Sequence, residues 1–329
     1  MGKYFKEGRR EKGEGRKIFY FFLSSILYLL FFGFYGCAVK PYHSQTRLIM
    51  GTVMEIVAQD EKAIEAAFKE IEHIDDLMSN YKPESEISRL NKDGQVKASP
   101  ETLAVVKASK KLFRFSEGAF DITVGPLIKL WNVKGNMQKD ASLIRIPGEG
   151  KIKEALSCVG TNFIDIDEKN SIIRLKKKSV ILDLGAIAAG YAVDRAIAVL
   201  KQNGVRNALV NAGGEIYCLG KKGFSYWKVG LQNPRKKDGV ADIVKLRNRA
   251  VATSGDYEQF FVYENKRYAH IIDPRTGYPV DNGIISVSVF ADDCTTADAL
   301  GTAIFVLGKE KGEQLAKRFK NVEVKIITK

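Results

Sequence analysis

Two residue types that often carry disulfide or metal chemistry are scarce in this sequence. Among 329 residues there are only four cysteines and three histidines. After Cys37 the cysteines are Cys158, Cys218 and Cys294. Their spacing matches no zinc motif, and an odd number leaves at least one thiol unpaired. The sequence therefore argues against a disulfide framework and a cysteine zinc site, and we expect these cysteines to be buried and inert.

Several features that would assign a function directly are also missing. There is no internal repeat, and no linker clearly divides the chain after its N-terminal segment. The net charge of +13 would suit a nucleic-acid partner, but the basic residues are spread along the chain. No aromatic-basic stacking motif or recognised binding module accompanies them, so nucleic-acid binding is not expected. The length is sufficient for a sizeable core in one large domain or two.

The N-terminus has the pattern of an export signal. Seven lysines and arginines precede residues 18–34, an almost wholly apolar run of seventeen residues that leads to Gly36 and Cys37. This ending resembles the lipobox of bacterial lipoproteins, in which Cys37 would be lipidated, for example with palmitate. An uncleaved membrane anchor is the alternative, because the run is only slightly short for a span. In both cases the body of the protein would lie on the outer, periplasmic face of the bacterial cytoplasmic (inner) membrane. We divide the chain into a leader (1–36), a tether (37–45) and a domain (46–329).

The rest of the chain shows mixed helical and strand patterns. Strand-like runs are clustered and separated by short glycine, asparagine or lysine turns, which indicates antiparallel pairing. Helical stripes occur separately, so the pattern favours an α+β fold over a doubly wound sheet. We predict helices over 64–78, 99–115, 192–203, 295–307 and 309–319, a hairpin over 162–175, a polar loop over 78–91, an exposed excursion over 132–150, and strands over 47–59 (kinked at Gly51), 208–219, 227–231, 242–246, 250–254, 259–263, 284–290 and 322–327.

Residues 180–194 are the first candidate site. A buried-strand-like run reaches Asp183, turns at Gly185 and continues through Gly190 into a helical pattern. The first N–H groups of such a helix attract anions such as a pyrophosphate. The stretch lacks the Lys-Ser/Thr pair of a P-loop and the glycine pattern of a Rossmann fold. Close packing of a strand against a helix would select the same small residues and remains an alternative.

Asp298 and Thr302 form the second candidate site. Four residues apart on a helix, they share one face, and two hard oxygens with small neighbours could hold Mg²⁺. Alternatively, the aspartate stabilises the start of the helix and the threonine is a core residue. Asp292 and Asp293, just before this helix, are predicted to be caps.

The third candidate is the loop that begins at His270. A histidine at the end of a strand, followed by a tight Asp273-Pro274-Arg275-Thr276-Gly277 turn, stands where catalytic loops occur. Histidine is also suited to proton transfer near neutral pH. A single histidine is more commonly structural, and that alternative stays open.

Taken together, six motifs resemble one family in composition and order. They closely resemble the ApbE family, the FAD:protein FMN transferases, over residues 50–307. The resemblance implies an ApbE-like (T-fold-like) architecture with largely antiparallel sheets and flanking helices. The six motifs are 183–185, 190–194, 211–214, 253–257, 270–274 with 276–277, and 296–300 with Thr302.

The resemblance also implies roles for individual residues. Mg²⁺ would be held by the backbone carbonyl of Ala186 together with Asp298 and Thr302. His270 would be the general base, held in place by Asp273 and its turn, and Asp298 would share in catalysis through the metal. Position 189 carries a longer polar side chain in many relatives, so a side-chain contact is missing there. The residues expected to contact FAD are Met50, Tyr81, Ala119, Phe120, Asp121, Asp183, Ala189 and Ile271.

The implied reaction is Mg²⁺-dependent transfer of FMN from FAD to a threonine or serine hydroxyl of a partner protein. The product would be a phosphoester-linked flavoprotein, with release of AMP, and the acceptors would be membrane redox subunits. Two alternatives remain: hydrolysis of FAD to FMN and AMP, and flavin binding without catalysis.

Overall fold

The computed structural model describes residues 41–236 and 239–329. The predicted leader, the apolar run and Cys37 lie outside the described residues. Residues 42–329 form one compact unit, and its first strand starts at His43. No helix within the described ranges combines the length and the hydropathy that a bilayer span requires.

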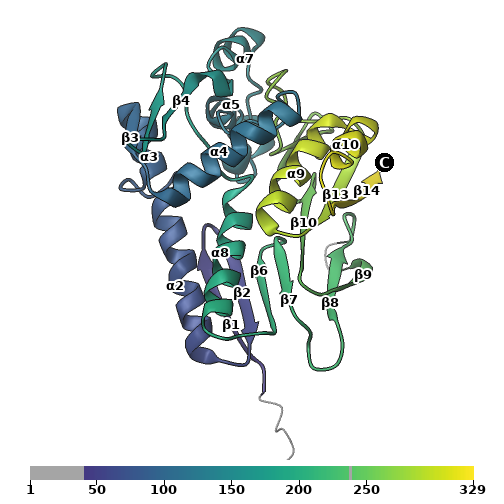
Figure 1. Ribbon diagram of the computed structural model, residues 1–329. Helices are drawn as coiled ribbons and strands as arrows, with labels where there is room; N and C mark the ends of the chain where they lie inside the picture. The colour runs from purple at the N-terminus through teal and green to yellow at the C-terminus, as the bar shows by residue number, and fades with distance from the viewer. Residues whose placement is uncertain (1–40, 237–238) are drawn as a thin grey trace, which may run out of the picture. The chain divides into compact units, whose positions relative to one another are not determined.

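A seven-stranded antiparallel sheet forms the centre of the domain (Figure 1). Its strand order is β1-β2-β6-β7-β10-β13-β14. The α+β prediction, including antiparallel pairing, is confirmed. The strands are β1 (His43–Ile49), β2 (Thr52–Ala58), β6 (Ala208–Ala212), β7 (Ile216–Leu219), β10 (Arg249–Gly255), β13 (Ile284–Ala291) and β14 (Glu323–Thr328).

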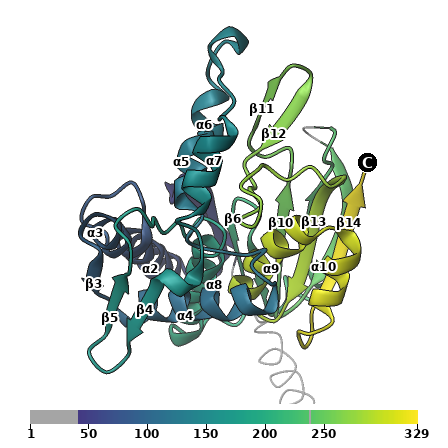
Figure 2. The ribbon, with the colours of Figure 1, turned by 90° about the horizontal axis from the view of Figure 1, so that it is seen from above.

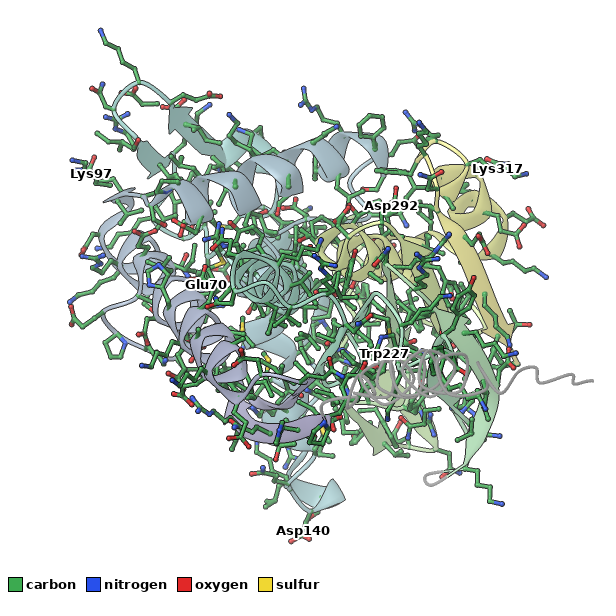
Figure 3. All side chains as sticks on the ribbon, turned by 60° about the horizontal axis from the view of Figure 1, so that its bottom comes forward. Glu70, Lys97, Asp140, Trp227, Asp292 and Lys317 are labelled. Atoms are coloured by element: carbon green, nitrogen blue, oxygen red, sulfur yellow. The ribbon has the colours of Figure 1, made fainter. Side chains whose placement is uncertain are left out.

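Helices cover one face of this sheet, and side chains fill the space between the two layers (Figure 3). The predicted helices form because their apolar residues fall on one stripe, and three of the five also begin at a side-chain cap, from Asp60, Ser99 and Asp293. Asp60 accepts from the Ala63 N–H at 3.0 Å, and Ser99, followed by Pro100, accepts from Thr102 at 3.2 Å. The helices are α2 (Glu61–Met78), α4 (Pro100–Phe115), α8 (Ala188–Gln202), α9 (Cys294–Leu307) and α10 (Lys309–Ala316).

Two smaller cores flank the main one. A ribbon of β8 (Trp227–Gln232) and β9 (Val240–Leu246) packs Trp227 against Cys218 and Val251 of the sheet. A hairpin of β11 (Phe260–Tyr263) and β12 (Lys266–Ala269) packs against α5–α7 (Figure 2). The remaining elements are α5 (Gly125–Trp131), α6 (Val133–Asn136), α7 (Glu149–Leu156), the short helices η1 (Ala141–Leu143) and η2 (Thr161–Phe163), and a small sheet of β3 (Gln95–Lys97), β4 (Ile164–Asp167) and β5 (Ile172–Leu175).

Three local predictions need correction. The kink at Gly51 is a complete turn, in which Met50 (φ 54°) and Gly51 (φ 74°) join β1 to β2. Residues 208–219 are two strands, because Gly213 (φ 78°) and Gly214 (φ 137°) reverse the chain between β6 and β7. In both places two consecutive residues with positive φ reverse the chain, as in a tight hairpin turn.

The third correction concerns two connecting segments. The polar segment 78–91 contains the start of a helix, α3 (Glu86–Asp93), which begins because the Ser85 hydroxyl caps the Ser88 N–H at 2.9 Å. The run 180–184 is extended but joins no sheet. Its one bridge is parallel, from Ile181 to Val124. Both segments lead toward the candidate site and help to position it.

Candidate functional site

A hydrogen bond between two residues of the predicted site, Gly190 and Asp298, joins the start of α8 to α9. The backbone N–H of Gly190 donates to Asp298 Oδ2 at 3.0 Å. Close approach is possible because residue 190 has no side chain: a Cβ there would lie 2.5 Å from the Cys294 carbonyl oxygen and 2.8 Å from Asp298 Cβ. Gly190 is therefore needed for the contact between the helices.

The Gly190–Asp298 bond changes which backbone groups at the start of α8 are hydrogen-bonded. In a regular helix the Gly190 N–H would donate to the carbonyl of Ala186, four residues earlier. Because the donor is used by Asp298, the Ala186 carbonyl keeps no partner among the described residues, and neither does the N–H of Ala189. The helix start thus offers one free acceptor and one free donor beside the Asp298 carboxylate.

Asp298 and Thr302 lie on the same face of α9, as predicted. Within the described ranges, Asp298 Oδ1 and the half-buried Thr302 hydroxyl have no hydrogen-bond partner. A second glycine keeps α9 close to β10, because a Cβ on Gly301 would lie 2.9 Å from Ser254 Oγ. The Gly190–Asp298 bond therefore joins two elements that carry unpaired oxygens: the start of α8, with the Ala186 carbonyl, and the face of α9 that holds Asp298 and Thr302.

Three acidic side chains influence one another at this junction. Burial raises the pKa of Asp298 to about 7, although the Gly190 N–H lowers it. Glu258 is exposed by surface area, but the protein atoms around its carboxyl group desolvate it and, together with the Asp298 carboxylate, raise its pKa to about 8. Burial, then Asp298 and Glu258, raise the pKa of Glu215 well above its usual value. The site is electrostatically suited to a cation.

Glu215 and Glu258 were missed by sequence reasoning. Each follows directly on a motif that had been singled out, 211–214 and 253–257. The sequence did contain one signal for them: each is an acidic residue that comes directly after a motif containing glycine. Their proximity to Asp298 depends on contacts between distant parts of the chain, which spacing does not reveal.

The donor set at the α8–α9 junction fits Mg²⁺. No group of three or more histidine, cysteine, aspartate or glutamate side chains in the described part of the chain is arranged to hold a metal ion. A cation here would rely on mixed oxygen donors, which is how Mg²⁺ binds when substrate phosphates and water complete its shell. The unpaired oxygens of Ala186, Asp298 and Thr302 meet that requirement, and these ligands stay predictions.

Asp194 holds the two helices together on the other side of this junction. Its carboxylate accepts from the N–H groups of Cys294 (2.7 Å) and Thr295 (2.8 Å), at the first turn of α9. Asp293 is the cap of α9, as predicted, and accepts from Thr296 at 2.7 Å. Asp292 instead accepts from Asn321. Burial raises the pKa of Asp194 to about 6 despite these donors.

Asp183 is fixed from both sides in the segment that leads to α8. Its Oδ1 accepts from the Gly185 N–H at 2.8 Å and its Oδ2 from Asn80 Nδ2 at 2.9 Å. Its own N–H donates to the Ile122 carbonyl at 2.7 Å. These bonds bring the predicted FAD contacts Asp183 and Tyr81 together with the turn that contains Asp121. Tyr81 is 85% exposed, so its ring is available to stack on a planar ligand.

Asp121 carries an unpaired oxygen inside the protein. Its Oδ1 accepts from the N–H and hydroxyl of Thr123, whereas Oδ2 is buried and has no partner among the described residues. Burial raises the pKa of Asp121 to about 6. Buried polar atoms are almost always paired, so an orphaned carboxylate oxygen fits a residue that accepts a bond from a ligand.

The other predicted FAD contacts differ in accessibility. Met50 is half-buried in the β1–β2 turn, where neighbouring Thr52 approaches Gly213 so closely that a Cβ on Gly213 would lie 2.1 Å from the Thr52 hydroxyl. Three predicted contacts, Ala119, Phe120 and Ile271, are at least 95% buried in the main core. Their side chains contribute packing here, and contact with FAD from these positions stays a prediction.

His270 is oriented by a different group from the one expected. With Nδ1 protonated, the ring donates to the Gln259 carbonyl oxygen at 3.2 Å, so Nε2 is left as the basic nitrogen. Burial lowers the pKa of His270, so the ring is neutral at pH 7. Asp273, expected to hold the ring, forms a bidentate pair with Arg275 at 2.8–2.9 Å. Gln259 directly follows Glu258, which belongs to the acidic cluster around Asp298. The His270 ring is therefore hydrogen-bonded to the neighbour of a residue in that acidic cluster.

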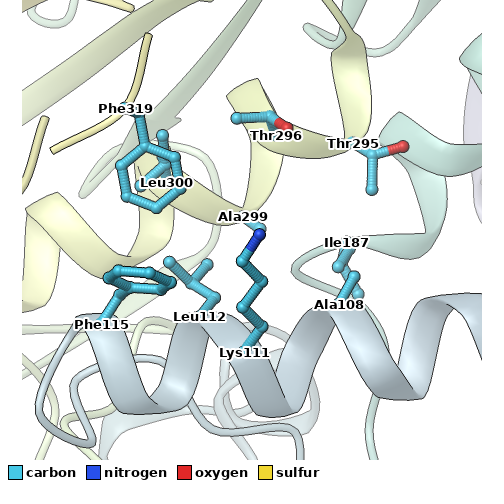
Figure 4. A pocket seen from close by; sticks show the side chains of 10 residues that line it. All are labelled: Ala108, Lys111, Leu112, Phe115, Ile187, Thr295, Thr296, Ala299, Leu300 and Phe319. Carbon is cyan, nitrogen blue, oxygen red and sulfur yellow. The ribbon is translucent and has the colours of Figure 1, made fainter.

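A cavity of about 240 Å³ lies on the α4 side of the α8–α9 contact (Figure 4). It is mainly apolar, with the ammonium group of Lys111 beside it. Ile187 and Ala299 line it, and both are sequence neighbours of predicted ligands, but the cavity contains none of the predicted site residues.

Three of the four cysteines lie in the described part of the chain. Cys158, Cys218 and Cys294 are free and buried, as predicted, and burial raises the pKa of Cys218 to about 12.

Comparisons with known proteins agree with this geometry. Residues 50–326 match the ApbE family. The chain is 35% identical over 251 residues to the FAD:protein FMN transferase of Vibrio cholerae serotype O1, covering 75% of this chain and 73% of that protein. It resembles the crystal structure of the ApbE protein from Thermotoga maritima with a TM-score of 0.78 and 35% identity, over 88% of this chain and 94% of that one. The structure of the flavin transferase ApbE from Vibrio cholerae gives a TM-score of 0.77 and 31% identity over the same shares. The chain therefore belongs to the ApbE family.

Proposed function

We propose that this protein transfers the FMN moiety of FAD to a threonine or serine hydroxyl of a partner protein and releases AMP. The observation that carries the proposal is the bond from the Gly190 N–H to Asp298 Oδ2, which frees the Ala186 carbonyl at the start of α8, while Asp298 Oδ1 and the Thr302 hydroxyl on α9 are also unpaired in the described part of the chain. The relatives named above as FAD:protein FMN transferases support the same reaction.

The proposed metal site depends on these oxygens. Mg²⁺, when bound, would neutralise charge on the pyrophosphate and on AMP as it leaves. Asp298 would supply the charged ligand, and the Ala186 carbonyl and Thr302 hydroxyl the neutral ones. The unpaired Ala189 N–H, in the first turn of α8, would donate to a phosphate oxygen and so orient FAD.

Two side chains would bind the flavin part of FAD. Asp121 would accept a hydrogen bond on its orphaned Oδ2, and Tyr81 would cover a planar ring with its exposed face. Asp183, fixed by Asn80 and Gly185, would hold the segment between them and α8. FAD would then extend from the loop around Asp121 to the start of α8.

His270 would act as the general base. The acceptor hydroxyl oxygen attacks the phosphorus on the FMN side of FAD, and its proton passes to Nε2 of His270. The bond from that phosphorus to the bridging oxygen breaks, and the electron pair leaves with AMP. Because burial lowers the pKa of His270, the neutral form that can accept a proton dominates at pH 7.

The acceptors and the cellular location are part of the same proposal. Lipidation at Cys37, or an uncleaved anchor, would hold the domain at the periplasmic face of the cytoplasmic membrane. Flavoproteins of membrane redox complexes would then be the substrates within reach.

The test is an incubation of the protein with FAD, Mg²⁺ and a candidate acceptor flavoprotein. We expect flavin fluorescence that stays on the acceptor band after denaturation. Free FMN with AMP would instead indicate a hydrolase, and unchanged FAD a carrier. A version of the acceptor in which the modified threonine is replaced by valine is the control, since it has no hydroxyl to attack phosphorus.

A further inference from the structure

The loop between β7 and β8, residues 221–226, exposes aromatic side chains to an unusual degree. Phe224 is 97% exposed and Tyr226 is 46% exposed. A phenylalanine this open gains nothing from the core. Exposed aromatic residues that lie together with basic ones are typical of surfaces that meet a partner or a membrane interface.

The loop is held in one conformation. Lys222 and Ser225 pair through both backbone bonds, at 2.9 and 3.2 Å, so that Gly223 (φ 62°) and Phe224 form the tip of a tight turn. The Tyr42 hydroxyl donates to the Lys221 carbonyl at 3.1 Å. The exposure of Phe224 is therefore a property of an ordered turn.

Two lysine ammonium groups of the loop lie beside aromatic rings. The Lys221 ammonium lies 5.5 Å from the Tyr226 ring centre, and the Lys222 ammonium lies 5.6 Å from that of Trp227. The backbone of exposed Arg206 lies directly below the loop, where a Cβ on Gly220 would be 2.1 Å from its carbonyl oxygen. None of these three basic side chains forms an ion pair with another described residue. The loop therefore combines exposed rings with a net positive charge.

The loop also lies where the chain enters the domain. Tyr42 packs its ring against Trp227, with centroids 5.6 Å apart. The start of β1 and the β7–β8 connection both lie at the lower end of the sheet in Figure 1. Tyr42 follows the end of the apolar run at Phe34 by eight residues. Eight extended residues span at most about 28 Å, so an anchor at the apolar run would keep the end of the domain that begins at Tyr42 within that reach of the bilayer. The β6–β7 turn with Glu215 is at the opposite end of β7.

We propose that residues 221–226 form a second membrane contact, in which Phe224 and Tyr226 enter the interface of an anionic phospholipid bilayer. Aromatic rings favour this depth of the bilayer, and Lys221, Lys222 and Arg206 would lie over the phosphates. The contact orients the domain, so that the end of the sheet with Asp298 faces away from the lipid.

The test places a tryptophan at the tip of the loop in the full chain. Phe224→Trp is reconstituted into vesicles of phosphatidylcholine with or without phosphatidylglycerol, with brominated lipids as quenchers. Trp131 and Trp227 are buried, so the unsubstituted chain gives the background. The matched control is Val262→Trp, at a 49% exposed position on β11, in the hairpin that leads to His270.

We expect brominated lipid to quench the added fluorescence of Phe224→Trp and to leave that of Val262→Trp unchanged. Each lysine at an anionic surface contributes about 1 kcal/mol, about fivefold in an equilibrium constant. Replacing Lys221 and Lys222 by glutamine should therefore weaken the contact about thirtyfold without lowering the thermal stability. Equal quenching at both positions, no quenching at position 224, or quenching independent of phosphatidylglycerol would overturn the proposal. Flavin transfer in detergent does not depend on this contact, so failure here leaves the proposed function untouched.

Discussion

Gly190→Ala tests the junction of α8 and α9 by adding a single methyl group. The new Cβ would lie 2.5 Å from the Cys294 carbonyl oxygen, whereas contacts below 3.0–3.4 Å are rarely found. The two helices would have to separate by about 0.5–0.9 Å at this point. The Gly190–Asp298 bond, now 3.0 Å, would then lengthen toward the limit of a hydrogen bond.

The two expected effects of this substitution differ in size. Overpacking costs about 1–3 kcal/mol, and the better helix propensity of alanine offsets at most about 1 kcal/mol of it. The free energy of unfolding should therefore fall by about 0–3 kcal/mol. Metal affinity should fall more, because groups that position a ligand typically contribute about 10- to 100-fold in affinity.

The assay is calorimetric titration of Mg²⁺ into the protein with FAD present, with thermal unfolding measured in parallel. The matched control is Gly150→Ala in the first turn of α7, where an added Cβ meets nothing within 4 Å. It should leave Mg²⁺ binding unchanged and not lower stability. If Gly190→Ala folds and binds Mg²⁺ like the unsubstituted chain, the reasoning about this junction is refuted.

Three further predictions follow from the site. His270→Ala should retain FAD while transfer falls about 10²- to 10⁴-fold; loss of FAD in equilibrium binding would make the residue a packing element instead. Because Asp298 must lose its proton to bind metal and its pKa is about 7, Mg²⁺ affinity should fall about tenfold per pH unit below pH 7, and equal affinity at pH 6 and pH 8 would contradict this. Folding raises the pKa of Asp121 from 3.8 to about 6. The folded state then binds the proton more tightly, and its stability falls as pH rises through that interval. Asp121→Asn should flatten this part of the curve of unfolding free energy against pH, and an unchanged curve would show that Oδ2 is not desolvated.

Local patterns predicted most of the helices and strands. The stripe in α2 and the Ser99-Pro100 start of α4 were sufficient, because each depends on residues within a few positions of one another. The start of α3 was missed because Ser85 lies in a polar segment, where a helix cap and an ordinary turn look alike. The β1–β2 turn was missed because its first residue, Met50, has positive φ, which is unusual for methionine.

The candidate site was predictable in its parts but not in its connections. Spacing on one helix paired Asp298 with Thr302, and the resemblance to a family suggested Ala186. The hydrogen bond that frees the Ala186 carbonyl joins residues 108 positions apart, so only the folded chain reveals it. The same reason applies to His270, because its ring bonds to the backbone carbonyl of Gln259, in the segment between β10 and β11. Any residue supplies such a carbonyl, and the side chain at that position therefore carries no signal.

The stoichiometry of the products tests the central claim most directly. After incubation with FAD, Mg²⁺ and an acceptor protein, AMP is quantified by chromatography and acceptor-bound FMN by intact-protein mass spectrometry. We predict one AMP for each acceptor that gains the mass of FMN less one water. AMP matched by free FMN, with the acceptor mass unchanged, would contradict the account.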